Sequence, residues 1–283
     1  MQAVHAVPPQ ADSLPVLEER AEILLHEAVN GEYRLMQVEA PAQAQRARAG
    51  QFFHLLCPQD DALKPFFRRP MSIYAINAEG GRISFLYKVT GTGTKALARL
   101  GVGERLDMLG PLGIGFSLPP DTTPGQKTPI VILARGVGLA TLAPLVGLAR
   151  GEGHAVTAVL SARSPDLLMS VAETRAAGAE AIAVTDSEGN SDTGHVAALL
   201  DDLHAKGRMG ALYTCGSNRL LKLAQEHAAR HGLFGEVAME QQMACGLGMC
   251  FCCVRAFREG DATVHRRVCC EGPVFPLEEA LGW

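Results

Sequence analysis

The first part of the chain, from about residue 16 to 118, consists of short apolar runs separated by glycine, asparagine and proline. Many of the residues in these runs are β-branched or aromatic, a composition that favours strands. The predicted strands are Ala21–Leu25, Tyr33–Val38, Gln51–Leu56, Met71–Ile76, Arg82–Val89 and Arg105–Leu109, interrupted by one predicted helix, Thr94–Leu100. A series of short strands at this spacing predicts a small β-barrel over residues 16–118.

A linker rich in proline, threonine and glycine follows at residues 119–126. Beyond it, apolar strand runs alternate with helical runs, which predicts a parallel sheet covered by helices on both faces. The predicted strands are Ile130–Ala134, Ala155–Leu160, Ala181–Thr185, Ala211–Cys215 and Gly235–Met239. The predicted helices are Ala140–Arg150, Pro165–Ala177, Gly194–Ala205 and Asn218–His231. We expect an α/β nucleotide-binding domain over residues 128–239, after which the alternation ends in a cysteine-rich segment, residues 240–283.

That segment holds six of the eight cysteines, all between positions 245 and 270. Three of them follow the spacing C-x4-C-x2-C, which with a later cysteine is typical of a plant-type [2Fe–2S] cluster. These three are Cys245, Cys250 and Cys253. Gly246 and Gly248 allow the backbone of the same loop to approach a cluster closely. The spacing alone does not choose between Cys269 and Cys270 as the fourth ligand.

A zinc site with four cysteine ligands is the main alternative, and it would make the chain a non-catalytic module. Zinc sites usually show two short cysteine pairs, whereas three candidate ligands here crowd one glycine-bearing loop. The pattern therefore favours iron–sulfur over zinc, and it leaves Cys252 as a spare thiol.

Composition excludes several function classes. The chain has 283 residues and a formal net charge of −4. Binding of nucleic acid requires a strongly basic surface, and this net charge gives no sign of one. No apolar run reaches the roughly 18 residues of a membrane helix, and the first 15 residues do not resemble a secretory signal. Clustered cysteines favour a metal site in a reducing compartment, so we expect a cytoplasmic protein.

Two stretches of the predicted barrel are suited to binding phosphate. In Arg68–Ile73 an arginine lies beside a proline-bent strand, and its planar guanidinium suits a pyrophosphate. In Phe85–Thr94 a strand runs into a Gly/Thr turn and then a helix, where Thr92 or Thr94 could cap the helix and free N–H groups could hold an anion. A surface arginine and an ordinary turn are the alternatives, but the two stretches together favour phosphate binding.

Two further stretches fall at strand ends of the predicted parallel sheet, where open α/β sheets bind ligands. Gly136 and Gly138 lie in a strand–turn–helix context that suits a nucleotide pyrophosphate, although the sequence is not a full G-x-G-x-x-G match. Cys215 ends a later strand. A tight turn and a small buried hydrophobe are the plain structural alternatives.

The combination resembles the ferredoxin–NADP reductase superfamily, and within it the electron-transfer subunits of NAD-dependent dihydroorotate dehydrogenases. The resemblance covers nearly the whole chain after about residue 18. It rests on three motifs: Arg-Arg-Pro-Met-Ser-Ile at 68–73, Gly-Pro-Leu-Gly-Ile-Gly-Phe at 110–116, and Val-Cys-Cys-Glu-Gly-Pro-Val-Phe at 268–275. In the family the last cluster ligand lies three residues before Gly-Pro-Val-Phe, which implies Cys269 here and leaves Cys270 as a spare.

The resemblance implies a flavin barrel of the ferredoxin-reductase type, a parallel-sheet nucleotide domain and a small C-terminal iron–sulfur segment. It also implies FAD as the barrel's cofactor. The residues that match the family's flavin motifs are Arg69, Pro70, Met71, Ser72, Leu86, Tyr87, Lys88, Gly93 and Thr94. Hydride from NAD(P)H would reach FAD, and single electrons would then pass through a [2Fe–2S] cluster to a catalytic flavoenzyme subunit of the dihydroorotate dehydrogenase type. We therefore expect a hetero-oligomer that serves pyrimidine biosynthesis.

Two departures from the family pattern affect the nucleotide site. Arg135 replaces a glycine of the Gly-Gly-Gly-x-Gly turn, and Ser217 replaces the proline of Cys-Gly-Pro. They leave open whether NADH, NADPH or neither donates electrons. They also leave open an adaptor role in another redox complex, of the hydrogenase or ferredoxin-linked transhydrogenase type.

Overall fold

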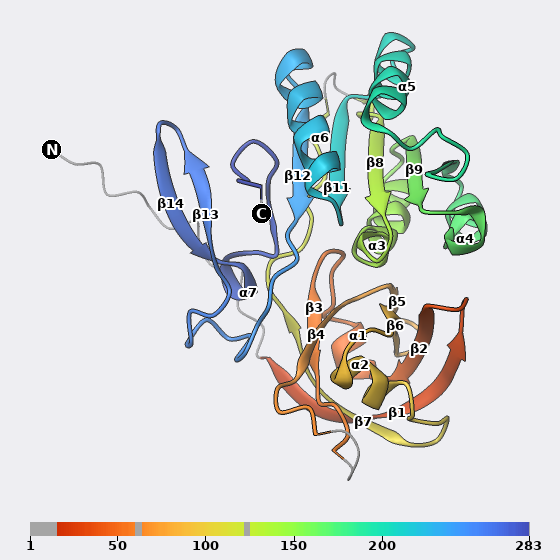
Figure 1. Ribbon diagram of the computed structural model, residues 1–283, viewed down its shortest axis with the longest axis vertical. Coiled ribbons are helices and arrows are strands. Elements are labelled where there is room, and N and C mark those ends of the chain that lie inside the picture. The colour runs from red at the N-terminus through yellow and green to blue at the C-terminus, as the bar shows by residue number, and fades with distance from the viewer. Residues whose placement is uncertain (1–15, 60–63, 122–124, 283) are drawn as a thin grey trace, which may run out of the picture.

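The structure is a computed structural model that describes residues 16–59, 64–121 and 125–282 (Figure 1). The start of the chain and the centre of the expected linker lie outside the described residues. Among the described helices, none has the length and apolarity to cross a membrane.

Seven strands form an antiparallel sheet that curls into a half-barrel, in the lower half of Figure 1. Along the sheet the order is β4-β3-β7-β1-β2-β6-β5, so β4 and β5 are its two ends. The strands are β1 (Leu17–Ala28), β2 (Tyr33–Glu39), β3 (Phe52–Leu55), β4 (Arg69–Ser72), β5 (Ala75–Asn77), β6 (Arg82–Lys88) and β7 (Arg105–Leu112), with two short helices, α1 (Pro41–Ala44) and α2 (Thr92–Leu97). The predicted strand Met71–Ile76 is thus two strands, β4 and β5.

Side chains of β6 pack alternately into two hydrophobic cores, one on each face of the strand. Phe85 and Tyr87 point into the half-barrel, where Phe85 meets Phe53 edge-on at 5.6 Å between ring centroids. Leu86 points the other way and packs with the nucleotide-side core. Because side chains alternate between the faces of a strand, one short element anchors both parts of the molecule.

The second sheet has six strands in the order β10-β9-β8-β11-β12-β15. Five are parallel: β8 (Ile130–Arg135), β9 (Val156–Ala162), β10 (Glu180–Thr185), β11 (Ala211–Cys215) and β12 (Phe234–Ala238). Figure 1 places α3 (Gly138–Gly151) and α4 (Val171–Ala176) on the face toward the half-barrel, and α5 (Thr193–Ala205) and α6 (Asn218–His231) on the other. This arrangement matches the parallel sheet that the sequence predicts.

The prediction of one continuous helix over Pro165–Ala177 is wrong. The segment divides into a 3-10 turn, Pro165–Leu167, and α4, because Ser170 adopts a left-handed conformation with φ of 59°. The other three helices match their predictions to within two residues at each end.

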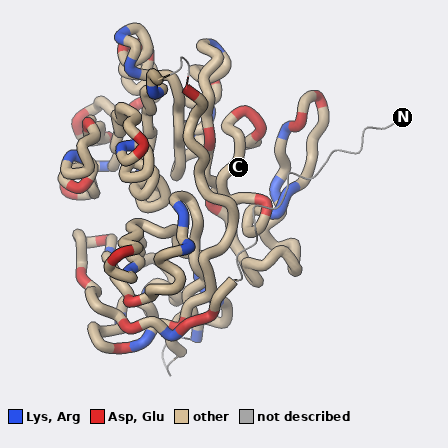
Figure 2. Tube along the Cα trace, turned by 180° about the vertical axis from the view of Figure 1, so that it is seen from behind, with Lys and Arg blue, Asp and Glu red and all other residues tan. Residues whose placement is uncertain are grey.

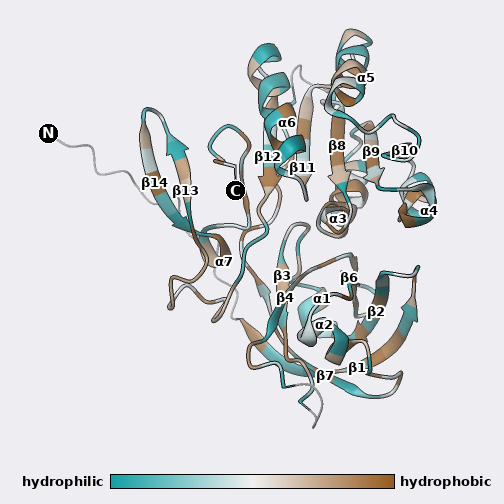
Figure 3. Ribbon diagram, in the orientation of Figure 1, coloured by the Kyte–Doolittle hydropathy of each residue, from teal (hydrophilic) through white to brown (hydrophobic). Residues whose placement is uncertain are grey.

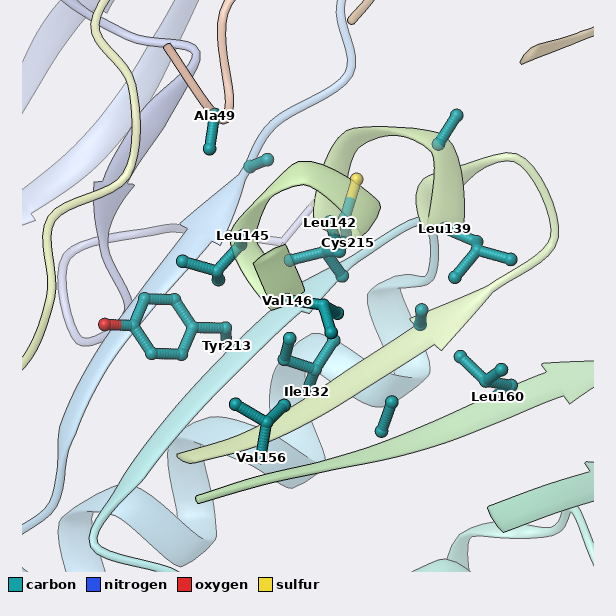
Figure 4. Close-up of a cluster of buried hydrophobic side chains, with 14 of the residues drawn as sticks. Ala49, Ile132, Leu139, Leu142, Leu145, Val146, Val156, Leu160, Tyr213 and Cys215 are labelled. Carbon is teal, nitrogen blue, oxygen red and sulfur yellow. The ribbon is translucent and has the colours of Figure 1, made fainter. Parts of the chain in front are cut away.

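The core between α3 and the parallel sheet is built mainly from aliphatic side chains, as Figure 4 shows. Ile132, Leu142 and Leu145 are fully buried there, and Tyr213 and Cys215 reach the same core from β11. Burying an aliphatic side chain of this size contributes about 1.5–3 kcal/mol, so this core fixes α3 firmly on the sheet.

Residues after 240 contain regular structure that the sequence pattern did not predict. A hairpin of β13 (Val254–Glu259) and β14 (Ala262–Arg267) leads into α7 (Val268–Glu271). The hairpin is mostly polar and exposed, with Phe257 as its buried anchor, so it lacks the apolar periodicity on which strand prediction relies.

The chain then passes through a junction between both sheets. The carbonyl of Gly272 accepts a hydrogen bond from Ile114 N–H at 2.6 Å, just beyond β7. The carbonyl of Pro273 accepts one from Met239 N–H at 2.8 Å, and β15 (Val274–Pro276) pairs antiparallel with β12. Residues 272–276 therefore join the half-barrel, the parallel sheet and the cysteine segment through backbone contacts.

Candidate functional site

The predicted flavin motif, Arg69-Pro70-Met71-Ser72, forms β4 at one end of the curled sheet. All four residues are partly exposed, so the strand is accessible to a ligand. The guanidinium of Arg69 lies against Gly93, where an added Cβ would come within 2.7 Å of Arg69 Cζ. An arginine and the first turn of α2 therefore meet at one place, as binding of a pyrophosphate requires.

The helix at this place begins earlier than predicted, and the predicted threonine cap is wrong. Gly91 is the N-cap residue of α2 and makes no side-chain cap. The hydroxyl of Thr94 accepts a hydrogen bond from Thr90 N–H at 2.9 Å and donates one to the Gly91 carbonyl at 3.2 Å. Thr94 thus stabilises the loop before the helix.

The predicted flavin stretch Leu86-Tyr87-Lys88 offers a ligand mainly its backbone. Tyr87 lies in the half-barrel core, where its hydroxyl bonds His26 Nε2 at 2.8 Å, and burial raises its pKa well above the usual value. Leu86 is buried, and Lys88 forms an ion pair with Glu32 at 2.8 Å. The Tyr87 side chain therefore cannot face a ligand on the outer surface.

The nucleotide-side glycines lie where two turns touch. A Cβ at Gly138 would collide with the carbonyl oxygen of Cys215, and one at Gly216 would come within 3.0 Å of the Gly138 Cα. Gly136 and Gly216 adopt positive φ of 55° and 95°. The turns after β8 and β11 thus pack backbone against backbone at the carboxyl ends of adjacent parallel strands, where such sheets bind nucleotides.

A line of hydroxyl and thiol groups connects these turns to the flavin strand. Thr141 and Ser72 share a hydrogen bond at 2.8 Å between their hydroxyl oxygens, and Thr141 also bonds the thiol of Cys215. Cys215 and Thr141 are buried, and burial raises the pKa of the Cys215 thiol. The sequence identified Ser72 and Cys215 separately, but not Thr141 as the residue between them.

Glu240 is a second residue that sequence reasoning missed. More than a third of its surface is exposed, yet the atoms packed around its carboxyl raise its pKa, and its charge contributes to the raised pKa of Cys215. In the sequence this carboxyl was detectable only as the glutamate that directly follows the last predicted strand, Gly235–Met239.

Arg135, the main departure from the family turn, points along the sheet and away from Cys215. Its Nη1 donates to Ser161 Oγ at 2.7 Å, and its Nη2 donates to Asp186 Oδ2 at 2.6 Å. Hydrogen bonding by Arg135 lowers the pKa of Asp186 to about 2. The cation that replaces a glycine is thus held over the ends of β9 and β10.

The cysteine loop arranges its predicted ligands as two pairs. The thiols of Cys245 and Cys250 interact with each other, as do those of Cys253 and Cys269, and the Cys270 thiol also interacts with that of Cys269. Cys269 N–H also donates to Cys253 Sγ at 3.4 Å. Within the described part of the chain, no three histidine, cysteine, aspartate or glutamate side chains converge as ligands of a single metal ion.

This pairing fits a binuclear cluster better than zinc. Four cysteines hold a [2Fe–2S] cluster with two ligands on each iron, whereas a structural zinc ion needs four ligands converging on one point. The remaining thiols are placed differently: Cys252 is exposed and donates to the Gln242 carbonyl at 3.9 Å, and Cys270 packs against Gly248, where an added Cβ would lie 2.8 Å from its sulfur.

The backbone of the loop is turned toward sulfur. Burial acts to raise the pKa of the Cys245 thiol, but hydrogen bonds from Leu247, Cys250 and Met249 outweigh it and lower that pKa to about 7. Positive φ at Gly246 and Gly248, of 70° and 80°, lets the chain wrap in this way. Thiolate is the ligand form of cysteine, so the loop favours metal binding.

His54 of β3 lies directly beneath this loop. A Cβ at Gly246 would come within 2.8 Å of His54 Nε2, and the ring is fully buried. Both ring nitrogens are without a hydrogen-bond partner among the described atoms. Burial, with the nearby Arg68 charge, lowers the pKa of His54 to about 4, so the ring is neutral at pH 7.

The cysteine loop exposes apolar side chains and carries no charge of its own, although the Arg267 guanidinium lies over the Phe251 ring, 5.4 Å from its centroid. Leu247, Met249 and Phe251 are 44%, 79% and 63% exposed. Residues 241–254 include no lysine, arginine, aspartate or glutamate, and Figure 2 shows this loop in tan between charged segments. Hydrophobic stretches also mark the loop in Figure 3. Exposed apolar patches of this kind mark interaction sites.

The cysteine segment and the chain as a whole both resemble known proteins. Residues 240–281 match the family described as the iron–sulfur cluster binding domain of dihydroorotate dehydrogenase B. Two relatives are named dihydroorotate dehydrogenase B (NAD(+)), electron transfer subunit. The one from Desulforamulus reducens is 34% identical over 85% of this chain and 89% of its own length. The one from Enterococcus faecalis OG1RF is 35% identical over 83% and 87%.

Solved structures show the same fold. An NADH-dependent reduced ferredoxin–NADP oxidoreductase structure, described in work on flavin-based electron bifurcation, superposes with a TM-score of 0.76 at 24% identity, over 92% of this chain and 89% of that one. A ferredoxin reductase of carbazole 1,9a-dioxygenase gives a TM-score of 0.59 at 19% identity, over 78% and 68%. The chain belongs to the family of electron transfer subunits of the oxidoreductase dihydroorotate dehydrogenase B.

Proposed function

We propose that this chain collects electrons from NAD(P)H on FAD and passes them through a [2Fe–2S] cluster to a catalytic flavoenzyme subunit that acts on dihydroorotate. When bound, FAD accepts electrons as a pair and the cluster carries them singly. The observation that carries the proposal is the position of β4. Its Ser72 bonds Thr141 beside Cys215, and its neighbour β3 carries His54 to the cysteine loop.

On the input side, the protein's task is to position groups and exclude water. Arg69 and the first turn of α2 would hold the flavin pyrophosphate, and the turns at Gly138 and Gly216 would receive the nucleotide. The line of Ser72, Thr141 and Cys215, of which Thr141 and Cys215 are buried, would then lie where flavin and nicotinamide rings meet. A buried site of this kind protects a hydride donor from side reactions with water.

On the output side, the protein holds the cluster near a surface suited to a partner. Cys245, Cys250, Cys253 and Cys269 would be the ligands, and the exposed Leu247, Met249 and Phe251 would contact the catalytic subunit. An apolar rim around a cluster gives a docking surface that needs little desolvation of charge. We also place the hetero-oligomer in the cytoplasm, since the clustered thiols suit a reducing compartment.

A second candidate is an adaptor subunit of another redox complex. The ion pair of Arg135 with Asp186 favours it, because a cation stands where the family pattern has a glycine. In this case electrons would arrive at the flavin from a donor other than a nicotinamide.

Anaerobic titration of the purified chain separates the candidates. We expect flavin and iron–sulfur absorption together, and bleaching of both by NADH or NADPH. Bleaching by dithionite alone would favour the adaptor role. A colourless protein that holds only zinc would contradict both candidates.

The partner is tested independently of the donor. Mixing with a dihydroorotate-oxidising flavoenzyme subunit should give a stable complex in which dihydroorotate reduces the cluster. A Met249→Glu variant, which charges the exposed rim, should weaken this complex and leave NAD(P)H bleaching intact. Equal complex formation by the variant would show that the rim is not the contact.

A further inference from the structure

His54 is the one described histidine whose ring is fully buried with both nitrogens unbonded. A buried donor without a partner loses its hydrogen bonds to water and gains none in return, so native proteins rarely retain one without reason. An apolar residue of similar size would fill the same space without that cost.

The surroundings of His54 place it between the two proposed redox sites. In the sheet it pairs with Pro70 of the flavin motif on β4. Across the packing interface its Nε2 edge meets Gly246, the residue that follows the proposed ligand Cys245. Its ring lies 5.8 Å from that of Phe52, whose core also contains Cys253 and Cys269. His54 thus contacts the cluster loop from the flavin side.

The charges near His54 are few. Arg68 lies close enough to disfavour a second cation, and its guanidinium is engaged by Glu18 and Asp107. The ring is therefore neutral and carries one N–H. Sulfur of a cluster and its thiolates accepts hydrogen bonds, and such bonds raise the reduction potential because they stabilise the more negative reduced state.

We propose that His54 is a positioning residue for the iron–sulfur centre, whose Nε2–H donates to sulfur at the Cys245 end of the cluster and holds the cluster loop against the flavin strand. This inference rests on the proposed function, since it requires a cluster in that loop. It assigns a role to the half-barrel in setting the cluster potential, beyond the cysteine segment itself.

The first test is spectroscopic and uses the full chain with its cofactors. Protein labelled with ¹⁵N only in histidine, with the cluster reduced by dithionite, should show a ¹⁵N coupling in pulsed electron paramagnetic resonance. His54→Leu should abolish this coupling, and His265→Leu, on the exposed β14, should keep it. Absence of any histidine coupling in the unmutated protein would overturn the proposal without reliance on a variant.

The second test measures the cluster midpoint potential. Loss of one hydrogen bond in His54→Leu should shift the one-electron equilibrium about tenfold toward the oxidised form, which is about 59 mV more negative. His54→Gln, which retains an N–H donor near the same position, should lie closer to the unmutated value. Equal potentials in the Leu variant and the unmutated protein would contradict the proposed bond.

These outcomes are separable from failure of the proposed function. A chain without iron and sulfide would refute the function itself. A chain with a cluster that NAD(P)H reduces, but with no histidine coupling, would refute only the role of His54. If the Leu variant loses its cluster, the Gln variant and the labelled unmutated protein still decide the question.

Discussion

The two ends of the proposed electron path are built in opposite ways. At the nucleotide end, Thr141 and Cys215 are 3% and 1% exposed, and backbone packs on backbone. At the cluster end, Met249 and Phe251 are 79% and 63% exposed on a loop without charge. The difference follows from the chemistry: hydride exchange needs contact and exclusion of water, whereas output to a second protein needs an accessible face.

Glycine serves both ends, but for different reasons. At Gly138 the absence of a side chain permits two turns to touch. At Gly246 and Gly248 positive φ permits the chain to curve around sulfur. Substitutions at each end should therefore separate into losses of nucleotide reactivity and losses of cluster.

The largest effect should come from a ligand at the cluster end. Cys253→Ser should lower iron and labile sulfide content at least about tenfold, because a four-cysteine cluster loses one thiolate. FAD should stay bound, since β4 and α2 do not depend on this thiol. Metal analysis with flavin absorption measures both, and Cys252→Ser, which changes an exposed spare thiol, is the matched control. Simultaneous loss of FAD in a folded Cys253→Ser chain would show that the two ends are not independent.

At the nucleotide end, Gly138→Ala should slow flavin reduction by NAD(P)H by about 100-fold, because displacing a reactive geometry by about 1 Å has effects of this size. The new Cβ would meet the Cys215 carbonyl, which cannot move freely. Stopped-flow reduction measures the rate, while reduction by dithionite should be unaffected. Gly147→Ala in the same helix, with no described neighbour within 4 Å of its added Cβ, should leave the rate unchanged. Equal rates in all three proteins would remove this turn from the nucleotide site.

Between the two ends, Arg69→Ala should weaken FAD binding about 10- to 100-fold, since charge-assisted hydrogen bonds contribute about 1.5–3 kcal/mol. Flavin retained after dialysis, or a titration with FAD, measures the effect. Arg68→Ala is the matched control, because Arg68 forms ion pairs with Glu18 and Asp107, whereas Arg69 lies against Gly93. Stronger flavin loss in Arg68→Ala than in Arg69→Ala would reverse the assignment.

The smallest effect concerns Arg135. Its pair with Asp186 is partly exposed, so Arg135→Ala should lower the free energy of unfolding at pH 7 by less than about 1 kcal/mol. The pKa of Asp186 is depressed to about 2, so the contribution is present above the unfolded value of about 3.9 and lost as pH falls through about 2. Urea unfolding should give a constant difference between pH 7 and 5 that shrinks below about pH 4. If the difference in unfolding free energy between the variant and the unmutated protein grew as the pH fell, Asp186 would not be the partner of Arg135.

Much of the fold was predictable because its elements carry strong local signals. Ala211–Cys215 and Asn218–His231 have the predicted bounds, since one is an apolar run interrupted only by Thr214 and the other begins at a serine cap and ends at glycine. The β13–β14 hairpin was not predictable by the same means, because its faces are largely exposed and Phe257 is a single anchor.

The candidate site likewise contains some residues that could be identified from the sequence and others that could not. Cysteine spacing is local in sequence, so the ligand loop could be recognised before its structure. Thr141 and His54 could not, because their roles arise from contacts with residues far along the chain: Thr141 with Ser72, and His54 with Gly246. A histidine in an apolar strand has no sequence signal that separates packing from function.

The junction at residues 272–276 bears on how such a protein can diverge. It joins the half-barrel, the parallel sheet and the segment carrying Cys269 through backbone hydrogen bonds, and it leaves no room for a side chain at Gly272, where an added Cβ would collide with the Phe275 ring. The position of this segment relative to both sheets therefore does not depend on the exposed loop residues Leu247, Met249 and Phe251. Substitutions at those exposed positions can therefore change the surface offered to a partner without moving the cysteine segment relative to the half-barrel.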